Sequence, residues 1–311
     1  MKKVVSVSLG SSSRNHKVTI IIKGETFEIE RIGTDGDMDR AIELIKELDG
    51  KVDAFGMGGI DLYLNGGNKK YIIKDARPIA NAAKISPIVD GTFVKNTLER
   101  KVIKYIRDKK IIDFNNKKVL LVCGLDRFGM AEALIESGGN LTFGDAIFSL
   151  GWNFPIHSMK MLHIVANILA PVVCRMPFEM IYPTGKNQEK KNYKYTKYFD
   201  ENEIIAGDFI YIKKYMPDNM DGKIIITNTV TQGDVDDLKV KGARMLITTT
   251  PEFNGRSFGT NVMEAILTSL SSKKHIEMTE GDYSDLINHI GFVPRVEYMG
   301  IHDNTEVKCQ V

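Results

Sequence analysis

The chain has 311 residues, of which 43% are hydrophobic and 26% charged, so it is long enough to bury the cores of two globular domains. Its net charge of +2 is too small to attract nucleic acid or a membrane surface through a long-range field, and we expect neither as a partner. The three cysteines are widely spaced without a CxxC pair, and no histidine or carboxylate cluster suggests a metal. We therefore predict no disulfide framework, no metal site and a cytoplasmic location.

Residues 1–113 are predicted to form an α/β domain that holds the substrate and the catalytic groups. Strands that alternate with helices at this spacing are typical of an α/β layer. The expected elements are strands at 4–9, 17–23 and 26–32, a helix at 38–48, a strand at 52–57 and a helix at 92–108.

Polar loops follow three of these strands, and open α/β sheets bind their ligands where strands end. Ser11 and Ser12 follow the first strand, Asp35 follows the third, and Asp61 follows the fourth. We predict that Ser11, Ser12 and Asp35 bind substrate. The alternative is that Asp35 only caps the next helix and that the glycines before Asp61 only make a turn.

Lys95 is the predicted proton-transfer residue. It lies near the start of the helix at 92–108, with Asp90 a turn upstream. A lysine and an aspartate that share a cleft can move a proton to or from a hydroxyl while hydride leaves the same carbon, because the pKa of lysine falls readily on partial burial. Asp90 or Asp61 would assist it. The alternative is a surface lysine on an amphipathic helix.

The stretch from 117 to 145 has the order of a dinucleotide-binding unit. A short apolar strand at 119–123 is followed by Gly124, a second glycine at Gly129, a helix, a strand at 141–143 and then Asp145. A strand, a glycine turn that opens a helix, and a carboxylate about twenty residues further on are the parts of such a unit.

The residue types in this unit suit the chemistry of a dinucleotide. Pyrophosphate must approach backbone N–H groups at a helix start, and glycine leaves room for it. Asp145 would accept the ribose hydroxyls of NAD and repel the 2′-phosphate of NADP, whereas Arg127 could pair with phosphate, so NAD is favoured and NADP stays open. The alternative is an ordinary strand-turn-helix that binds nothing. The predicted cofactor-binding residues of this unit are Gly124, Leu125, Arg127, Phe128, Gly129, Met130 and Asp145.

Residues 204–270 predict the second half of a doubly wound sheet in the Rossmann order, with strands at 204–206, 223–227 and 244–248 and a helix at 258–270. The polar ends of its strands are predicted to face the nicotinamide, and the residues that open the last helix are predicted to hold a polar or anionic group of the substrate. A threonine-rich strand end and an ordinary helix cap are the alternative. The cofactor-binding residues of this half are Thr227, Asn228, Thr229, Thr248 and Thr249, and the substrate-binding residues are Arg256, Thr260 and Asn261.

Two further stretches raise alternatives of another kind. The apolar run at 159–181 contains Lys160 and His163, so we predict buried helices and not a membrane span. The lysine- and tyrosine-rich segment at 185–200 resembles a nucleic-acid patch, but in a nearly neutral chain we favour a solvated insertion.

Several motifs together carry a resemblance: SVSLGSSSR, GTDGD, GGIDLYL, GLDRFGM, IIITNTVT and TTTPEFNGRSFGTNVMEA. They resemble a clostridial-type family labelled quinate 5-dehydrogenase, and the domain order is similar to that of shikimate dehydrogenases. The resemblance implies a substrate domain at 1–113, a Rossmann-like dinucleotide-binding domain at 114–271 and a C-terminal segment at 272–311 that returns to the first domain. The chain departs from the larger family at the turn, where GLDRFG replaces GAGGA.

From these observations we predict an NAD(P)-dependent oxidoreductase that transfers a hydride between a nicotinamide and a small polar alcohol or ketone. The resemblance implies a quinate- or shikimate-like, polyhydroxy cyclic substrate. Two alternatives stay open: a nucleotide- or metabolite-sensing protein with a Rossmann core and no turnover, and an enzyme that uses the same cofactor domain on an acyl group. The expected partners are a small-molecule substrate and, as an open option, a second copy in a homodimer.

Overall fold

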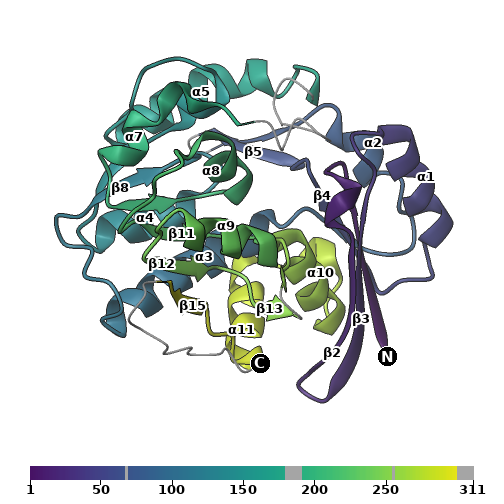
Figure 1. The fold of residues 1–311 in the computed structure, drawn as a ribbon. Coiled ribbons are helices and arrows are strands. Elements are labelled where there is room, and N and C mark those ends of the chain that lie inside the picture. Colours follow the sequence, from purple (N-terminus) through teal and green to yellow (C-terminus); the bar gives the residue numbers. More distant parts are fainter. Residues whose placement is uncertain (67–68, 179–190, 254–255, 300–311) are drawn as a thin grey trace.

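The computed structural model describes residues 1–66, 69–178, 191–253 and 256–299. These residues form two α/β units, each built on a mainly parallel sheet (Figure 1). A cavity lies between them. The predicted fold class, an α/β unit followed by a Rossmann-like doubly wound sheet, is confirmed by the strand pairing.

The first sheet has the strand order β2-β3-β1-β4-β7. β1 is parallel to β3 and β4, and β2 closes one edge as the antiparallel partner of β3. The side chains of β1 alternate between two cores, because Val4 packs on one face and Val5 and Val7 pack on the other. The strands are β1 (Lys2–Ser8), β2 (His16–Ile22), β3 (Glu25–Gly33), β4 (Ala54–Gly58) and β7 (Ile88–Val89).

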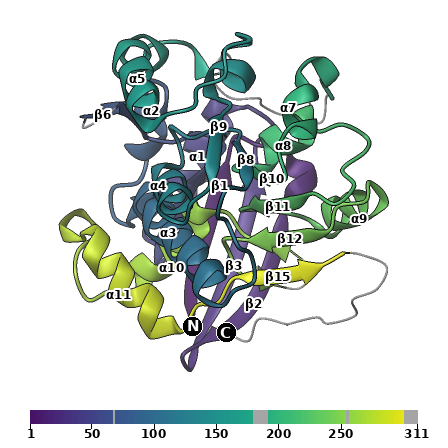
Figure 2. The ribbon, with the colours of Figure 1, turned by 90° about the vertical axis from the view of Figure 1, so that its left-hand side faces the viewer.

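Helices cover both faces of this sheet (Figures 1 and 2). α1 (Met38–Leu48) and α2 (Ala76–Ala80) share the core that contains Val5. The other face is covered by α3 (Thr92–Asp108), α10 (Thr260–Leu270) and α11 (Glu280–Ile290). Burial on both faces explains why both faces of β1 and β4 carry buried apolar side chains, among them Val4, Val5 and Phe55.

The second sheet has the strand order β15-β12-β11-β10-β8-β9, in which all strands except β15 are parallel. Val119 and Leu121 of β8 pack in one core and Leu120 packs in the other. The strands are β8 (Lys118–Leu121), β9 (Asn140–Phe143), β10 (Ile204–Ala206), β11 (Ile224–Thr227), β12 (Met245–Thr248) and β15 (Arg295–Tyr298), with helices α4 (Phe128–Glu136), α8 (Phe209–Tyr215) and α9 (Gln232–Val240) between them.

Counted from β8, the parallel strands have the order 2-1-3-4-5, which differs from the expected Rossmann order, in which a third strand lies beyond the second. After β9 the chain makes a π-helical turn, η2 (Asp145–Ser149), and then α5 (Met159–Val173). α5 contacts the small β5-β6 hairpin of the first unit, so the segment after β9 leaves the second sheet. The doubly wound character is retained, because β10 adds to the opposite side of β8.

The last helices return to the first unit. α10, predicted as the final helix of the second domain, packs against β1, β4 and α3, and β15 then pairs with β12 of the second sheet. Gly91 makes the close approach of α10 possible, because a Cβ atom there would lie 2.6 Å from the backbone nitrogen of Asn261. The chain therefore crosses between the units more than once, and the expected boundaries at 113 and 271 stay a prediction.

The segment at 191–200, predicted to be solvated, instead contributes to the second core. Tyr195, Tyr198 and Phe199 are buried there, because their rings pack around Phe148 and its neighbours. Residues 185–190 of that segment, and residues 179–181 of the apolar run, lie outside the described part. The remaining elements are β5 (Tyr63–Gly66), β6 (Lys69–Ile72), β13 (Glu252–Phe253), β14 (Arg256–Ser257), η1 (Ser12–Arg14), η4 (Tyr193–Tyr195), α7 (Lys197–Asp200) and η5 (His275–Glu277).

Among the helices of the described residues, none combines the length and the apolar composition that crossing a membrane requires.

Candidate functional site

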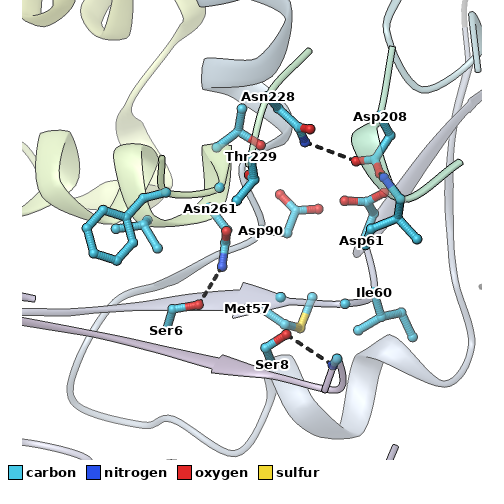
Figure 3. Close-up of a pocket in the computed structure, with 18 of the residues that line it drawn as sticks. Ser6, Ser8, Met57, Ile60, Asp61, Asp90, Asp208, Asn228, Thr229 and Asn261 are labelled. Carbon is cyan, nitrogen blue, oxygen red and sulfur yellow. Dashed lines mark hydrogen bonds between the residues drawn. The ribbon is translucent and has the colours of Figure 1, made fainter. Parts of the chain in front are cut away.

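A polar cavity lies between the two units, where the carboxyl ends of β1, β4, β10 and β11 meet the starts of α3 and α10. Its volume is about 170 Å³. An engineered apolar cavity of about 150 Å³ is enough for benzene, so this cavity has room for one small molecule. Figure 3 shows side chains from both units around it, with Asp61, Asp90 and Asp208 on one side and the Ser6–Asn261 hydrogen bond on another.

Lys95 lies at the centre of the charged side of the cavity. It is buried on α3, and its Nζ atom is 3.2 Å from Asp61 Oδ1 and 2.7 Å from Asp126 Oδ1. Burial acts to lower the pKa of Lys95, but the negative charges of Asp126 and Asp61 outweigh it and raise the pKa above its ordinary value. The expectation that burial would lower the pKa of this lysine is therefore wrong, and Lys95 keeps its proton.

The two carboxylates that share Lys95 differ in proton affinity. Burial and the charge of Asp126 raise the pKa of Asp61 to about 7, although Lys95 opposes this shift. Burial also acts to raise the pKa of Asp126, but Lys95 and Arg127 outweigh it and hold that pKa below its usual range. Asp61 can thus gain or lose a proton near neutral pH, whereas Asp126 stays ionised.

Asp90 lines the same cavity but is bonded to the protein. Its carboxylate accepts hydrogen bonds from Leu62 N at 2.8 Å, Thr92 N at 3.0 Å and Thr92 Oγ1 at 2.7 Å. It therefore ties the loop that carries Asp61 to the start of α3. Of the two carboxylates predicted to assist Lys95, Asp61 accepts a hydrogen bond from its Nζ atom at 3.2 Å, and Asp90 fixes the backbone around it.

Arg127 forms a buried ion network at the wall of the cavity. Its guanidinium pairs with Glu99 of α3 and, at 3.0 Å, with Asp208, and Asn228 Nδ2 donates to the same Asp208 oxygen at 2.9 Å. Burial raises the pKa of Glu99 to about 7 although Arg127 opposes this shift. The network joins α3 to the ends of β10 and β11. The guanidinium of Arg127 is therefore already paired with two carboxylates of the protein itself.

The turn between β8 and α4 does not fit a pyrophosphate, because its backbone amides are already bonded. Asp145 Oδ2 accepts from Gly124 N at 2.9 Å, and Asp145 Oδ1 accepts from Leu125 N at 2.8 Å. Gly129 N donates to Asn96 Oδ1 at 3.2 Å. We therefore assign no step of a reaction to a nicotinamide bound at this turn.

The two glycines of the turn make room for the protein itself. A Cβ atom on Gly124 would lie 2.5 Å from the Phe143 ring, and one on Gly129 would lie 2.1 Å from the backbone oxygen of Asn96. The absence of a side chain at Gly124 thus allows Phe143 of β9 to pack against the turn. The absence of one at Gly129 allows α3 and α4 to approach each other.

The other predicted cofactor residues divide into two groups. Asn228 and Thr229 line the cavity with Arg127. Thr227 Oγ1 donates to Gly207 O at 2.7 Å and Thr248 Oγ1 donates to Thr250 O at 2.8 Å, so both are turned into the sheet. Outside the cavity lining lie Gly124, Leu125, Phe128, Gly129, Met130, Asp145, Thr227, Thr248 and Thr249, with Phe128 stacked on His163 and Met130 in the core.

The predicted substrate residues are divided as well. Thr260 and Asn261 line the cavity, and Asn261 Nδ2 donates to Ser6 Oγ at 2.8 Å. Ser12 N donates to Asp35 Oδ1 at 2.8 Å, and Ser11 Oγ lies 2.7 Å from Ser13 Oγ, so these loops are held to themselves outside the cavity lining. Arg256 is on β14, and its side chain lies outside the described part of the structure.

Sequence reasoning missed several residues that line the cavity. Asp126 and Asp208 carry negative charge, and Arg14 and Arg31 carry positive charge. Asp126 was visible, because it lies inside the glycine turn that the sequence already marks. Arg31 gave no signal, since its place opposite Ser6 follows only from the pairing of β1 with β3.

The family of the chain follows from a comparison with family models. Residues 93–299 match the model described as "Domain of unknown function (DUF8754)". The chain belongs to this family. Residues 3–90 match a second model, "Domain of unknown function (DUF8753)". The DUF8754 match contains Lys95, Asp126 and Asp145, and the DUF8753 match contains Asp61 and Asp90. No curated protein matches the sequence.

Several solved structures are distantly similar to the chain. A Mycobacterium smegmatis protein in complex with β-D-fucofuranose has 8% identity and a TM-score of 0.35, over 80% of each chain. The periplasmic arabinose-binding component from Shewanella sp. ANA-3 has 9% identity and a TM-score of 0.35, over 93% of this chain and 97% of the other. An NAD-dependent malic enzyme from Thermotoga maritima has 12% identity and a TM-score of 0.31, over 92% of this chain and 72% of the other. Likenesses at this level say nothing of ligand or reaction.

Proposed function

We propose that this protein is an enzyme that transfers a proton to or from a small polar substrate in the cavity between its two units. The observation that carries the proposal is the Lys95 ammonium, buried between Asp61 and Asp126 at the cavity wall. Pairs of carboxylates whose environments drive their pKa values apart are typical of acid–base sites.

Each of the three groups has a distinct role in this proposal. Ionised Asp61 accepts a proton from a substrate hydroxyl or from a carbon next to a carbonyl, and in the reverse direction protonated Asp61 donates it. Lys95 stays charged and stabilises the negative charge that develops on the substrate oxygen. Asp126 stays ionised and keeps Lys95 protonated and oriented.

The experiment is proton exchange in D₂O without added cofactor. Wild-type protein is incubated with a panel of hydroxy acids and hydroxy ketones, which carry a C–H next to a carbonyl or carboxylate group, and of cyclitols, which serve the cofactor experiment below. Proton NMR follows loss of C–H signals or formation of product. We expect turnover that increases up to about pH 7, where Asp61 becomes ionised, and an Asp61→Asn variant slowed by at least about 100-fold. Asp39→Asn, at an exposed position on α1, is the matched control. Equal rates in Asp61→Asn and wild type would refute the role of Asp61.

A second candidate is the function predicted from the sequence, an NAD(P)-dependent oxidoreductase of a quinate- or shikimate-like alcohol. The position of the Lys95–Asp61 pair between the two units favours it, because a hydroxyl must lose its proton when hydride leaves the same carbon. This candidate requires the dinucleotide to bind somewhere other than the amides of the β8–α4 turn. Absorbance near 340 nm with the same panel and NAD or NADP tests it.

The two experiments separate the candidates. Exchange without cofactor supports proton transfer alone, and an absorbance change that is lost in Asp61→Asn supports the dehydrogenase. Binding of a panel member by calorimetry, with neither signal, would instead support the metabolite-sensing alternative.

A further inference from the structure

The β8–α4 turn has the sequence pattern of a dinucleotide-binding turn, but its polar groups contact side chains of the protein itself. Its amides bond to Asp145, its helix start bonds to Asn96, and its arginine pairs with Glu99. In a dinucleotide-binding fold, the oxygens of a bound pyrophosphate accept hydrogen bonds from the backbone amides of such a turn. Here each of these groups meets a side chain of the same chain.

We propose that this turn is a self-occupied anion site, in which the Asp145 carboxylate takes the place of a pyrophosphate and holds Asp126 against Lys95. Asp145 is then a positioning residue, since it touches neither the cavity nor Lys95 and acts through the turn. The inference rests on the proposed function in one respect, namely that the Lys95–Asp126 pair has a role in catalysis.

The backbone contacts explain how Asp145 acts on Asp126. Leu125, the residue before Asp126, is fixed by its amide on Asp145. Arg127, the residue after it, is fixed by its amide on Gly124 O at 3.1 Å and by its side chain on Glu99. Asp126 therefore lies between two anchored residues, and its carboxylate reaches Lys95 Nζ at 2.7 Å.

Charge and burial oppose the exchange of Asp145 for a phosphate. Burial raises the pKa of Asp145 to about 6, against the two amides that lower it, so the carboxylate is mostly ionised at neutral pH. A phosphate would have to displace this anion from both amides and then lie near the carboxylate of Asp126. The space above both glycines is taken by Phe143 and Asn96.

The first test uses wild-type protein only. NAD, NADP and inorganic pyrophosphate are titrated to about 1 mM, with calorimetry and with NMR detection of the Gly124 and Leu125 amides. We expect no saturable shift of either amide. Saturable binding that moves both amides would overturn the proposal, whether or not any variant folds.

The second test compares two carboxylates that cap backbone amides. Asp145→Asn is paired with Asp49→Asn, because Asp49 accepts from Lys84 N at 2.7 Å and Ser86 N at 2.8 Å in the first unit, away from the β8–α4 turn. Titration of ¹³C carboxyl signals measures the pKa of Asp126. In Asp145→Asn we expect the weakened contact with Lys95 to raise that pKa by more than removal of the nearby Asp145 charge lowers it, and in Asp49→Asn we expect no change.

An unchanged Asp126 titration in folded Asp145→Asn would refute the positioning role. If Asp145→Asn does not fold, the wild-type amide titration decides the question. Neither measurement depends on turnover. If both tests give the expected results but the protein shows no proton-transfer activity, the proposed function is contradicted and this inference is not.

Discussion

Lys95 keeps its proton because two carboxylate oxygens lie within 3.2 Å of its Nζ atom, although its burial opposes the charge. The same burial raises the pKa of Asp61 to about 7, where the aspartate can exchange protons. Residue type alone suggested the opposite assignment, with lysine as the group that exchanges. At the scale of single residues, the neighbours therefore decide which side chain can exchange a proton near neutral pH.

Glu264 gives a prediction of pH-dependent stability. Its Oε2 accepts from Phe93 N and Val94 N, and burial together with Asp90 raises its pKa from 4.5 to about 8. The folded protein holds this proton more tightly than the unfolded chain, so its contribution to the free energy of unfolding is full below pH 4.5 and is lost as the pH rises to about 8.

We expect the free energy of unfolding to fall less steeply with pH in Glu264→Gln than in wild type. The difference in slope is at most about 1.4 kcal/mol per pH unit, which corresponds to one proton. Urea unfolding at several values between about pH 5 and pH 8 measures it. Glu280→Gln, at an exposed position on α11, serves as the control. Parallel curves for Glu264→Gln and wild type would contradict the prediction.

Helices α3 and α4 meet so closely that the contact depends on a missing side chain. A Cβ atom on Gly129 would lie 2.1 Å from the backbone oxygen of Asn96, and backbone cannot move aside as a flexible side chain can. The glycine that the sequence pattern predicts to bind a ligand is thus a packing position between two helices. Lys95 lies on α3, and Asp126, its ion-pair partner, lies just before the start of α4.

Gly129→Ala is therefore expected to destabilise the protein by about 1–3 kcal/mol or more, because the two helices must separate. Gly233→Ala, in the first turn of α9, is the matched control, since the nearest atom to its Cβ is 4.0 Å away. That control should be neutral or gain up to about 1 kcal/mol from helix propensity. Urea unfolding compares the two, and equal stabilities would exclude the packing role.

The two units are joined by segments that cross between them. α10 packs on the first sheet and α11 packs on α3 and α10, although both follow the parallel strands of the second sheet, and β15 then returns to the second sheet. The buried pair of Arg127 and Glu99 adds a link between α3 and the turn after β8. We infer that the cavity walls are held by the whole molecule and not by one unit alone.

A double-mutant cycle tests this link. Arg127→Met leaves Glu99 buried without its partner, so it should cost about 3–5 kcal/mol of unfolding free energy. Arg127→Met with Glu99→Gln should cost less than Arg127→Met alone, because position 99 then carries no unpaired buried charge. Additive losses in the cycle would show that the pair does not couple the units.

The sequence by itself determined the α/β class and most of the elements. The helix at 92–108 and the strands around β1, β3 and β8 follow from apolar periodicity, which is a local property of the chain. It also brought Lys95, Asp61 and Asp90 together as candidates, because polar residues after parallel strands converge on one edge of a sheet.

Only the tertiary structure decided what the glycine turn binds. Whether the amides of Gly124 and Leu125 meet a phosphate or a carboxylate depends on the direction of Asp145, which lies 21 and 20 residues away in sequence. The protonation of Lys95 likewise depends on Asp61 and Asp126, which lie 34 and 31 residues away. Contacts at such separations leave no periodic trace in the sequence, because they are set by how helices and sheets pack.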